Sequence, residues 1–194
     1  RTLFPYTTLF RSYIPSMTDR KLKYFERTKK QLSEYGNFEF NYFDIDDFCN
    51  MDKIDKIFKS DVIYLSDGNT YYFLNNLKKR YFITRLRRYV KNGGHIIGSC
   101  AGAIMMAKDI SSAQFGSEDI IGLSDLSSLA LVDFDFMPRW NKRSHYLNDI
   151  KEYSNNTGNT IYTCNDGGGI IVINNKLQFY GEINRIKEGQ IEQV

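Results

Sequence analysis

Hydrophobic and polar positions in the first half of the chain predict a regular alternation of strands and helices. Apolar residues recur near helical spacing in residues 19–35, and Gly36 after them is typical of a helix end. Residues 38–43 then alternate as a strand does. The other elements expected in this half are a strand ending at 13–16, a helix 51–58, a strand 61–66, a helix 71–92, a strand 95–99 and a helix that begins after Cys100.

This alternation predicts an α/β fold with a doubly wound, mainly parallel sheet, because parallel neighbours need helical crossovers between them. No repeat or low-complexity linker divides the chain, so we expect a single domain over residues 13–194 with one compact core. The elements expected in the second half are strands 129–137 and 160–163, a helix 144–154, and a hairpin of 169–173 with 176–181 that turns at Asn174-Asn175.

Composition excludes several classes of protein. The 194 residues are 42% hydrophobic and 25% charged, as in an ordinary globular domain, and the net charge of +3 is too small to favour a nucleic-acid partner. No apolar run approaches the roughly 20 residues of a membrane-spanning helix, so no membrane partner is expected. The three cysteines and two histidines lack metal-ligand spacing. We therefore expect no metal, no cofactor and a reducing, cytoplasmic setting.

We interpret the first twelve residues as a segment that does not belong to the natural protein. Residues 2–12 match the translation of a common sequencing-library adapter, so we expect residues 1–12 to be an artefact that replaces lost N-terminal sequence. A natural short strand around residues 7–10 is the weaker alternative. Without Arg1 and Arg11, 24 basic residues face 23 acidic ones, and the net charge falls to +1.

The segment Gly98-Ser99-Cys100-Ala101-Gly102 has the pattern G-x-C-x-G between an apolar strand and a helix. This is the layout of a nucleophile elbow, in which small residues allow a sharp turn that lifts the central side chain above the sheet edge. A helix N-terminus behind Cys100 favours the thiolate, and Ala101 N–H can stabilise an oxyanion formed at the sulfur. The alternative is an inert, buried cysteine in a tight strand-to-helix turn.

A second turn, Asp67-Gly68-Asn69-Thr70, follows a buried strand and precedes a helix. Asn69 or Thr70 can cap that helix. Gly68 permits a close backbone approach, so its N–H can be the second oxyanion donor. The same residues are also common in turns without any catalytic role.

Together with Met137-Pro138-Arg139-Trp140, these two turns resemble the peptidase E (aspartyl dipeptidase) family and its cyanophycinase relatives. The motifs of that family are G-G-N-T, G-x-S-A-G-A with a serine nucleophile, P-H before an aromatic residue, and an acidic residue before glycine. The resemblance covers nearly everything from Tyr13 onward and implies a class I glutamine amidotransferase-like (flavodoxin-like) fold. The roles that it implies are Cys100 as nucleophile, Gly68 and Ala101 as oxyanion hole, Arg139 at the histidine position, Asp166 as acidic member, and a pocket lined by Asn69, Thr70 and Trp140.

Two departures from the family pattern affect the chemistry. Cysteine in place of serine preserves a nucleophile, since a thiolate needs less help from a base. Arginine in place of histidine does not preserve a base, because a guanidinium stays protonated at neutral pH. We expect Arg139 to hold Cys100 as a thiolate and to pair with Asp166. His145 is the alternative base but is better interpreted as a surface residue, and His95, Cys49 and Cys164 are expected outside the site.

These features predict a hydrolase of short, Asp-leading peptides that forms an acyl intermediate on Cys100, with turnover impaired by Arg139. One alternative is a pseudoenzyme that binds peptide or acidic ligands. A glutaminase is disfavoured, since no histidine follows His145. A redox role for the elbow cysteine stays open. The expected partner is a small peptide, and both a monomer and a homodimer are compatible with the sequence.

Overall fold

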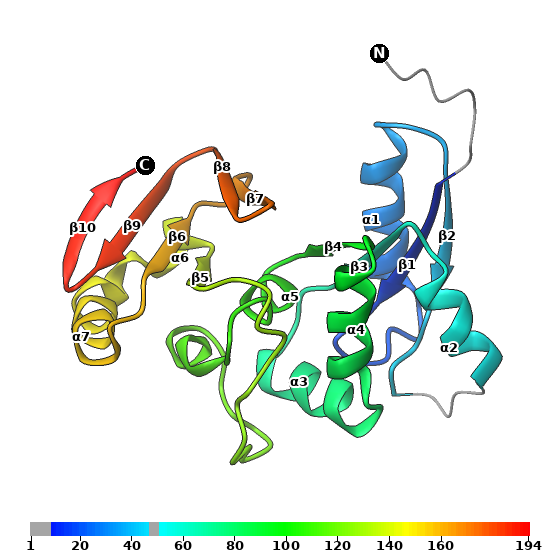
Figure 1. Cartoon of the computed structure of the whole chain (residues 1–194), viewed down its shortest axis with the longest axis horizontal. Helices are drawn as coiled ribbons and strands as arrows, with labels where there is room; N and C mark the ends of the chain where they lie inside the picture. Colours follow the sequence, from blue (N-terminus) through cyan, green and yellow to red (C-terminus); the bar gives the residue numbers. More distant parts are fainter. Residues whose placement is uncertain (1–8, 47–50) are drawn as a thin grey trace.

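The computed structural model describes residues 9–46 and 51–194, and its first half is a four-stranded sheet in which all neighbouring strands are parallel (Figure 1). The strand order is β2-β1-β3-β4. The elements of this half are β1 (Leu9–Ile14), α1 (Lys23–Ser33), β2 (Phe38–Tyr42), α2 (Met51–Phe58), β3 (Val62–Leu65), α3 (Thr70–Lys79), α4 (Phe82–Lys91) and β4 (His95–Gly98).

Helices cover both faces of this sheet. Alternate residues of a strand point to opposite faces, so neighbouring residues of β1 contact different helices. Tyr13 of β1 packs against Phe25 of α1, with ring centroids 5.4 Å apart. Its neighbour Ile14 belongs instead to the cluster that contains Leu74 of α3 and Leu86 of α4. The predicted α/β fold with a doubly wound, mainly parallel sheet is confirmed.

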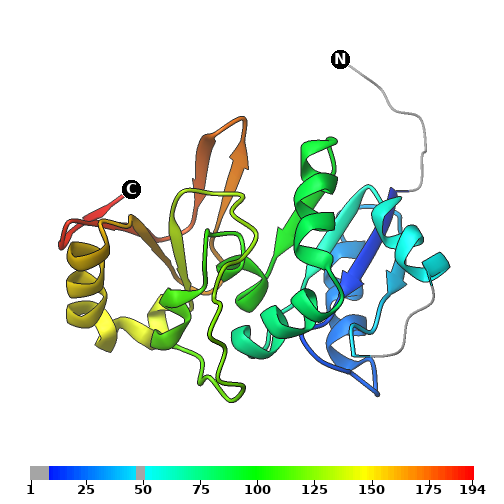
Figure 2. The same ribbon diagram turned by 60° about the horizontal axis from the view of Figure 1, so that its bottom comes forward.

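The second half forms a mixed sheet with the strand order β10-β9-β6-β5. Strands β5 and β6 are parallel, and the other two pairs are antiparallel. In Figure 2 the short helix α5 and the chain that follows it lie between the two sheets, and the β7–β8 hairpin projects from the second half. The elements are α5 (Ala101–Ile104), β5 (Asp135–Pro138), α6 (Trp140–Arg143), α7 (Leu147–Thr157), β6 (Ile161–Cys164), β7 (Gly169–Ile173), β8 (Lys176–Tyr180), β9 (Ile183–Lys187) and β10 (Gln190–Gln193), with single 3-10 turns at Ser111–Phe115 and Ser144–Tyr146.

The buried apolar side chains form three clusters rather than the one core expected. The largest lies around the parallel sheet and extends to Leu129. A second contains Phe115, Met137 and Trp140 with residues of α7, β6 and β9. A third lies under the β7–β8 hairpin, around Tyr162. The second half therefore has its own apolar support, which positions the residues after β5.

Two expected elements differ from the structure, and one element was not expected. The helix 71–92 is two helices, since Tyr81 takes a left-handed conformation (φ 57°) that the sequence does not signal. Of the strand expected at 129–137, only the last three residues are in a strand, β5, which extends to Pro138. The final hairpin β9–β10 was not expected, although Glu188-Gly189, both with positive φ, gave a turn signal. Within the described ranges, no helix is long and apolar enough to cross a membrane.

Strand β1 includes Leu9 to Ser12, the end of the segment that matches an adapter translation. Ser12 is fully buried, and its hydroxyl lies 2.6 Å from that of Ser60. Strand pairing uses backbone groups that every such residue carries, so this placement is compatible with either origin of the segment. The boundary at residue 13 stays a prediction.

Candidate active site

The two turns singled out in the sequence meet at one edge of the parallel sheet. Leu65, the last residue of β3, pairs in register with Gly98, the last residue of β4. Parallel strands end at the same edge, so the chain that follows each strand lies beside the other. Ser99 N–H donates to the carbonyl of Leu65 at 2.9 Å, and Gly102 N–H donates to that of Ser66 at 3.1 Å. These bonds fix the backbone of the two turns against each other.

Cys100 stands at the tip of a strained turn. Its φ of 47° and ψ of −103° lie where side chains are rarely found, and α5 begins at the next residue. A Cβ on Gly98 would collide with the backbone of Gly102, and one on Gly102 would collide with the carbonyl of Leu65. The two glycines of G-x-C-x-G are therefore required by backbone packing around the turn.

The thiol of Cys100 is held in its neutral form. Burial raises its pKa to about 11, and the carboxylate of Asp67 adds to the rise by its charge and by a hydrogen bond to the thiol. The positive charges of Arg139 and Arg143 lower the pKa of the thiol, but by less than burial and Asp67 raise it. Helix α5 is a single turn, so its dipole is small. The thiolate expected from the sequence is thus not the resting form.

Asp67 is the residue of this site that the sequence analysis did not single out. One of its carboxylate oxygens, Oδ1, accepts a hydrogen bond from Gly68 N–H at 2.6 Å, and the other, Oδ2, pairs with the Arg139 guanidinium. The available signal was an acidic residue directly before Gly68, where the family motif has glycine.

The two expected oxyanion donors differ in their availability. Gly68 takes a φ of 148°, and a Cβ there would collide with the hydroxyl of Ser16, so only glycine fits. Its N–H is engaged by Asp67. Ala101 is the first residue of α5, where helix geometry leaves the N–H without an intrahelical acceptor.

Arg139 and Asp166 do not pair with each other as expected. Arg139 precedes α6 and pairs with Asp67, whereas Asp166 accepts from Lys142 Nζ at 2.5 Å. Asp166 N–H also donates to Asn141 Oδ1 at 3.2 Å. The hydrogen bond from Lys142 is the main cause that lowers the pKa of Asp166, and Arg139 contributes least. Two ion pairs therefore replace the predicted one, because Asp67 lies closer to Arg139.

The three residues expected to line a substrate pocket, Asn69, Thr70 and Trp140, all make structural contacts. Asn69 caps α3 through Tyr72 N–H, and its amide donates to the carbonyl of Glu118 at 2.8 Å. Thr70 is fully buried, with its hydroxyl 3.2 Å from that of Ser117. Trp140 is only 8% exposed and packs in the second cluster. Thr70 and Trp140 are thus buried in this structure, and their role in lining a pocket stays a prediction.

His145 and Cys164 lie apart from this arrangement. His145 is exposed and its ring contacts that of Tyr146. Cys164 is buried in the third cluster, and Cys49 lies outside the described residues. Among the residues that the structure describes, no group of three or more His, Cys, Asp or Glu side chains could hold a metal ion.

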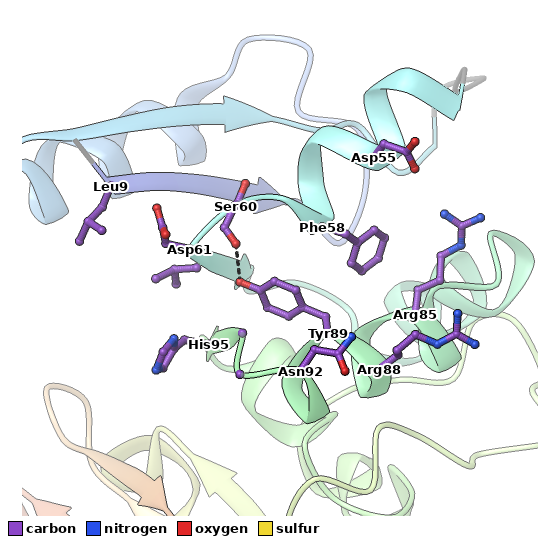
Figure 3. Close-up of a pocket in the computed structure, with 13 residues that line it drawn as sticks. Leu9, Asp55, Phe58, Ser60, Asp61, Arg85, Arg88, Tyr89, Asn92 and His95 are labelled. Carbon is purple, nitrogen blue, oxygen red and sulfur yellow. Dashed lines mark hydrogen bonds between the residues drawn. The ribbon is translucent and has the colours of Figure 1, made fainter. Parts of the chain in front are cut away.

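His95 lies at the opposite edge of the sheet, where β4 begins, beside a cavity of about 930 Å³ (Figure 3). Tyr89 donates to the carbonyl of Ser60 in its wall at 2.8 Å, and Arg85 lies over the ring of Phe58. Cys100 does not line this cavity or a second one of about 530 Å³ near Asp44. The candidate site is therefore the open sheet edge around Cys100.

Comparison with known proteins identifies the family. The model of peptidase family S51 matches residues 11–180. An uncharacterized peptidase of Pasteurella multocida (strain Pm70) is 31% identical over 96 residues, which are 48% of this chain and 44% of the relative. One of Listeria monocytogenes (strain EGD-e) is 31% identical over 88 residues, 44% of this chain and 43% of the relative. The matched stretch thus spans less than half the length of either curated relative.

Two solved structures share the fold. A provisionally named peptidase E protein from Listeria monocytogenes EGD-e has a TM-score of 0.65 at 24% identity, over 96% of this chain and 85% of that one. A peptidase from an acI-B1 actinobacterium has a TM-score of 0.67 at 12% identity, over 95% of this chain and 80% of that one. Since the family match covers most of the chain, this protein belongs to peptidase family S51, a family of peptidase-type hydrolases.

Proposed function

We propose that this protein hydrolyses short peptides through an acyl intermediate on Cys100. The observation that carries the proposal is the strained turn at Cys100, which places this residue at the sheet edge, directly before the first residue of α5, Ala101. Backbone strain of this kind persists only where the surrounding structure enforces it, and it concentrates at functional sites. Peptides that begin with aspartate are the substrate class implied by the family resemblance.

The reaction needs a proton to move from the nucleophile to the leaving group. The sulfur of Cys100 bonds to the carbonyl carbon, the oxyanion faces Ala101 N–H, and the C–N bond breaks as the amine takes up the thiol proton. Water then hydrolyses the thioester and restores the thiol. A guanidinium cannot accept the thiol proton, so solvent has to carry this proton from Cys100 to the leaving amine. We expect slow turnover.

A second candidate is a binding protein without turnover. It is favoured by one observation, the carboxylate of Asp67, which engages Gly68 N–H and accompanies a neutral Cys100 thiol. In this case the sheet edge around Cys100 would still bind a short peptide, but no acyl adduct would form.

The two candidates are separated by searching for the acyl adduct. Short peptides, including Asp-leading dipeptides, are incubated with the protein, and Cys100 is examined by peptide mass spectrometry alongside a fluorescent assay for released amine. The proposal predicts an adduct on Cys100 and slow amine release, both lost in Cys100→Ala. Cys164→Ala is the matched control, because Cys164 is the buried cysteine of another cluster. Peptide binding by calorimetry without adduct or amine would favour the second candidate.

A further inference from the structure

The side chain of Asp67 takes part in three interactions, and two of them oppose catalysis at Cys100. It pairs with the Arg139 guanidinium, accepts from Gly68 N–H at 2.6 Å, and places a negative charge beside the thiol. An attacked carbonyl oxygen would need the same N–H and would become negative in the same place. The carboxylate therefore competes with the reacting oxygen for Gly68 N–H and repels the negative charge that develops on it.

We infer that Asp67 is a built-in blocking group: its carboxylate, held by Arg139, occupies the Gly68 N–H and faces Cys100, so that thiol and donor are both withheld until the side chain moves away. Asp67 acts through Cys100 and Gly68 and is thus a positioning residue. The inference deepens the proposed function and rests on it for its consequence in turnover, but the reactivity of the thiol can be measured without any substrate.

The backbone at Asp67 is fixed, so only the side chain has to move. The hydroxyls of Ser16 and Ser66 both donate to the Asp67 carbonyl at 2.9 Å. Gly68 is packed against Ser16 and cannot shift toward it. Rotation of the carboxylate would release Gly68 N–H without disturbing the turn.

The contact that holds the carboxylate is weak enough to exchange. The side chains of Asp67 and Arg139 are 45% and 40% exposed. Ion pairs with this much exposure are screened by salt and contribute little. A ligand that attracts Arg139, or a peptide whose carbonyl takes Gly68 N–H, can therefore displace Asp67. Reversible displacement is what distinguishes a blocking group from a permanent defect.

The test measures how fast iodoacetamide alkylates Cys100 between pH 7 and 11, with peptide mass spectrometry to separate the cysteines. In Asp67→Asn the negative charge is lost, so the midpoint should fall below the wild-type value of about 11. A fall of one unit corresponds to about tenfold faster alkylation at pH 8. Asp67→Ala, which also frees Gly68 N–H, should be acylated by p-nitrophenyl acetate faster than Asp67→Asn.

The matched control is Asp125→Asn. Asp125 also pairs with a cation, Lys78, and accepts a backbone N–H, from Ser127, but it is not among the charges that act on Cys100. Its alkylation rate should stay within twofold of the wild type. If Asp67→Asn does not fold, as judged by circular dichroism, Asp67→Ser supplies an uncharged acceptor for Gly68 N–H.

The outcomes separate this inference from the proposed function. Faster alkylation of Cys100 in the Asp67 variants supports the blocking group. If none of these variants hydrolyses a peptide, that result overturns only the peptidase proposal. Unchanged or slower alkylation in a folded, uncharged variant overturns the blocking group, whatever the hydrolysis assay shows.

Discussion

The turn that carries Cys100 and the side chains that face it are stabilised in different ways. The turn is built from backbone contacts: Gly98 and Gly102 leave no room for a Cβ, and Ser99 and Gly102 are hydrogen-bonded to the end of β3. The facing side chains are held by half-exposed ion pairs, Arg139 with Asp67 and Lys142 with Asp166.

This difference shows how the backbone of the Cys100 turn can persist while the side chains that face it change. Close packing around a backbone tolerates almost no substitution, whereas an exposed ion pair contributes at most about 1 kcal/mol and is easily altered. Arginine at position 139 and aspartate at position 67 therefore leave the turn intact. A change of these side chains does not require any loss of the fold.

The largest expected effect on stability comes from the buried side chain that follows Arg139 in the chain. Trp140 is the next residue and is buried in the second cluster with Phe115 and Met137. Trp140→Ala should lower the free energy of unfolding by about 4 kcal/mol, through lost burial and the cavity left behind. Urea denaturation measures this, with Trp140→Phe as the milder control. A loss below about 1 kcal/mol would mean that Trp140 is not part of a core.

The next effect tests the turn itself. Gly102→Ala brings a Cβ into the Leu65 carbonyl, so it should destabilise the protein by about 3 kcal/mol in urea denaturation. Gly169→Ala is the matched control, since a Cβ there meets no atom within 4 Å. Equal stabilities of the two variants would show that the backbone of the Cys100 turn is free to relax.

A smaller effect follows from the raised pKa of Cys100. The folded protein keeps the thiol proton up to about pH 11, from an ordinary value of 9.0, whereas the unfolded chain loses it earlier. This stabilising contribution is therefore complete below pH 9 and is lost as the pH rises from 9 through 11, by about 3 kcal/mol in total. Urea denaturation at pH 7, 9 and 10.5 should show this decline in the wild type relative to Cys100→Ser. Parallel pH curves for the two proteins would contradict the raised pKa.

The smallest effect tests the ion pairs. Lys142 and Asp166 have side chains that are 63% and 43% exposed, so Lys142→Ala should change the free energy of unfolding by less than about 1 kcal/mol. Lys108→Ala, which removes an even more exposed pair with Asp133, is the control in the same denaturation assay. A loss above about 2 kcal/mol for Lys142→Ala alone would place this pair among the structural contacts.

Periodicity and turn chemistry predicted the parallel sheet, the helix Met51–Phe58 and the β7–β8 hairpin, whose Asn174 and Asn175 take the positive φ that this turn requires. They missed the break at Tyr81, where no glycine or proline marks the end of the helix. Periodicity and turn residues report only local conformation, and neither of them signals the break at Tyr81.

For the candidate site, the sequence by itself determined the positions that need small residues: the glycines around Cys100 and Gly68, whose spacing follows two parallel strands that end at one edge. Only the tertiary structure decided the partners. It joined Arg139 to Asp67 across 72 residues, left Asp166 to Lys142, and buried Trp140 in a separate cluster. The physical reason is that steric limits act on neighbours in the chain, whereas charge pairing and burial depend on distances that arise only when distant segments fold together.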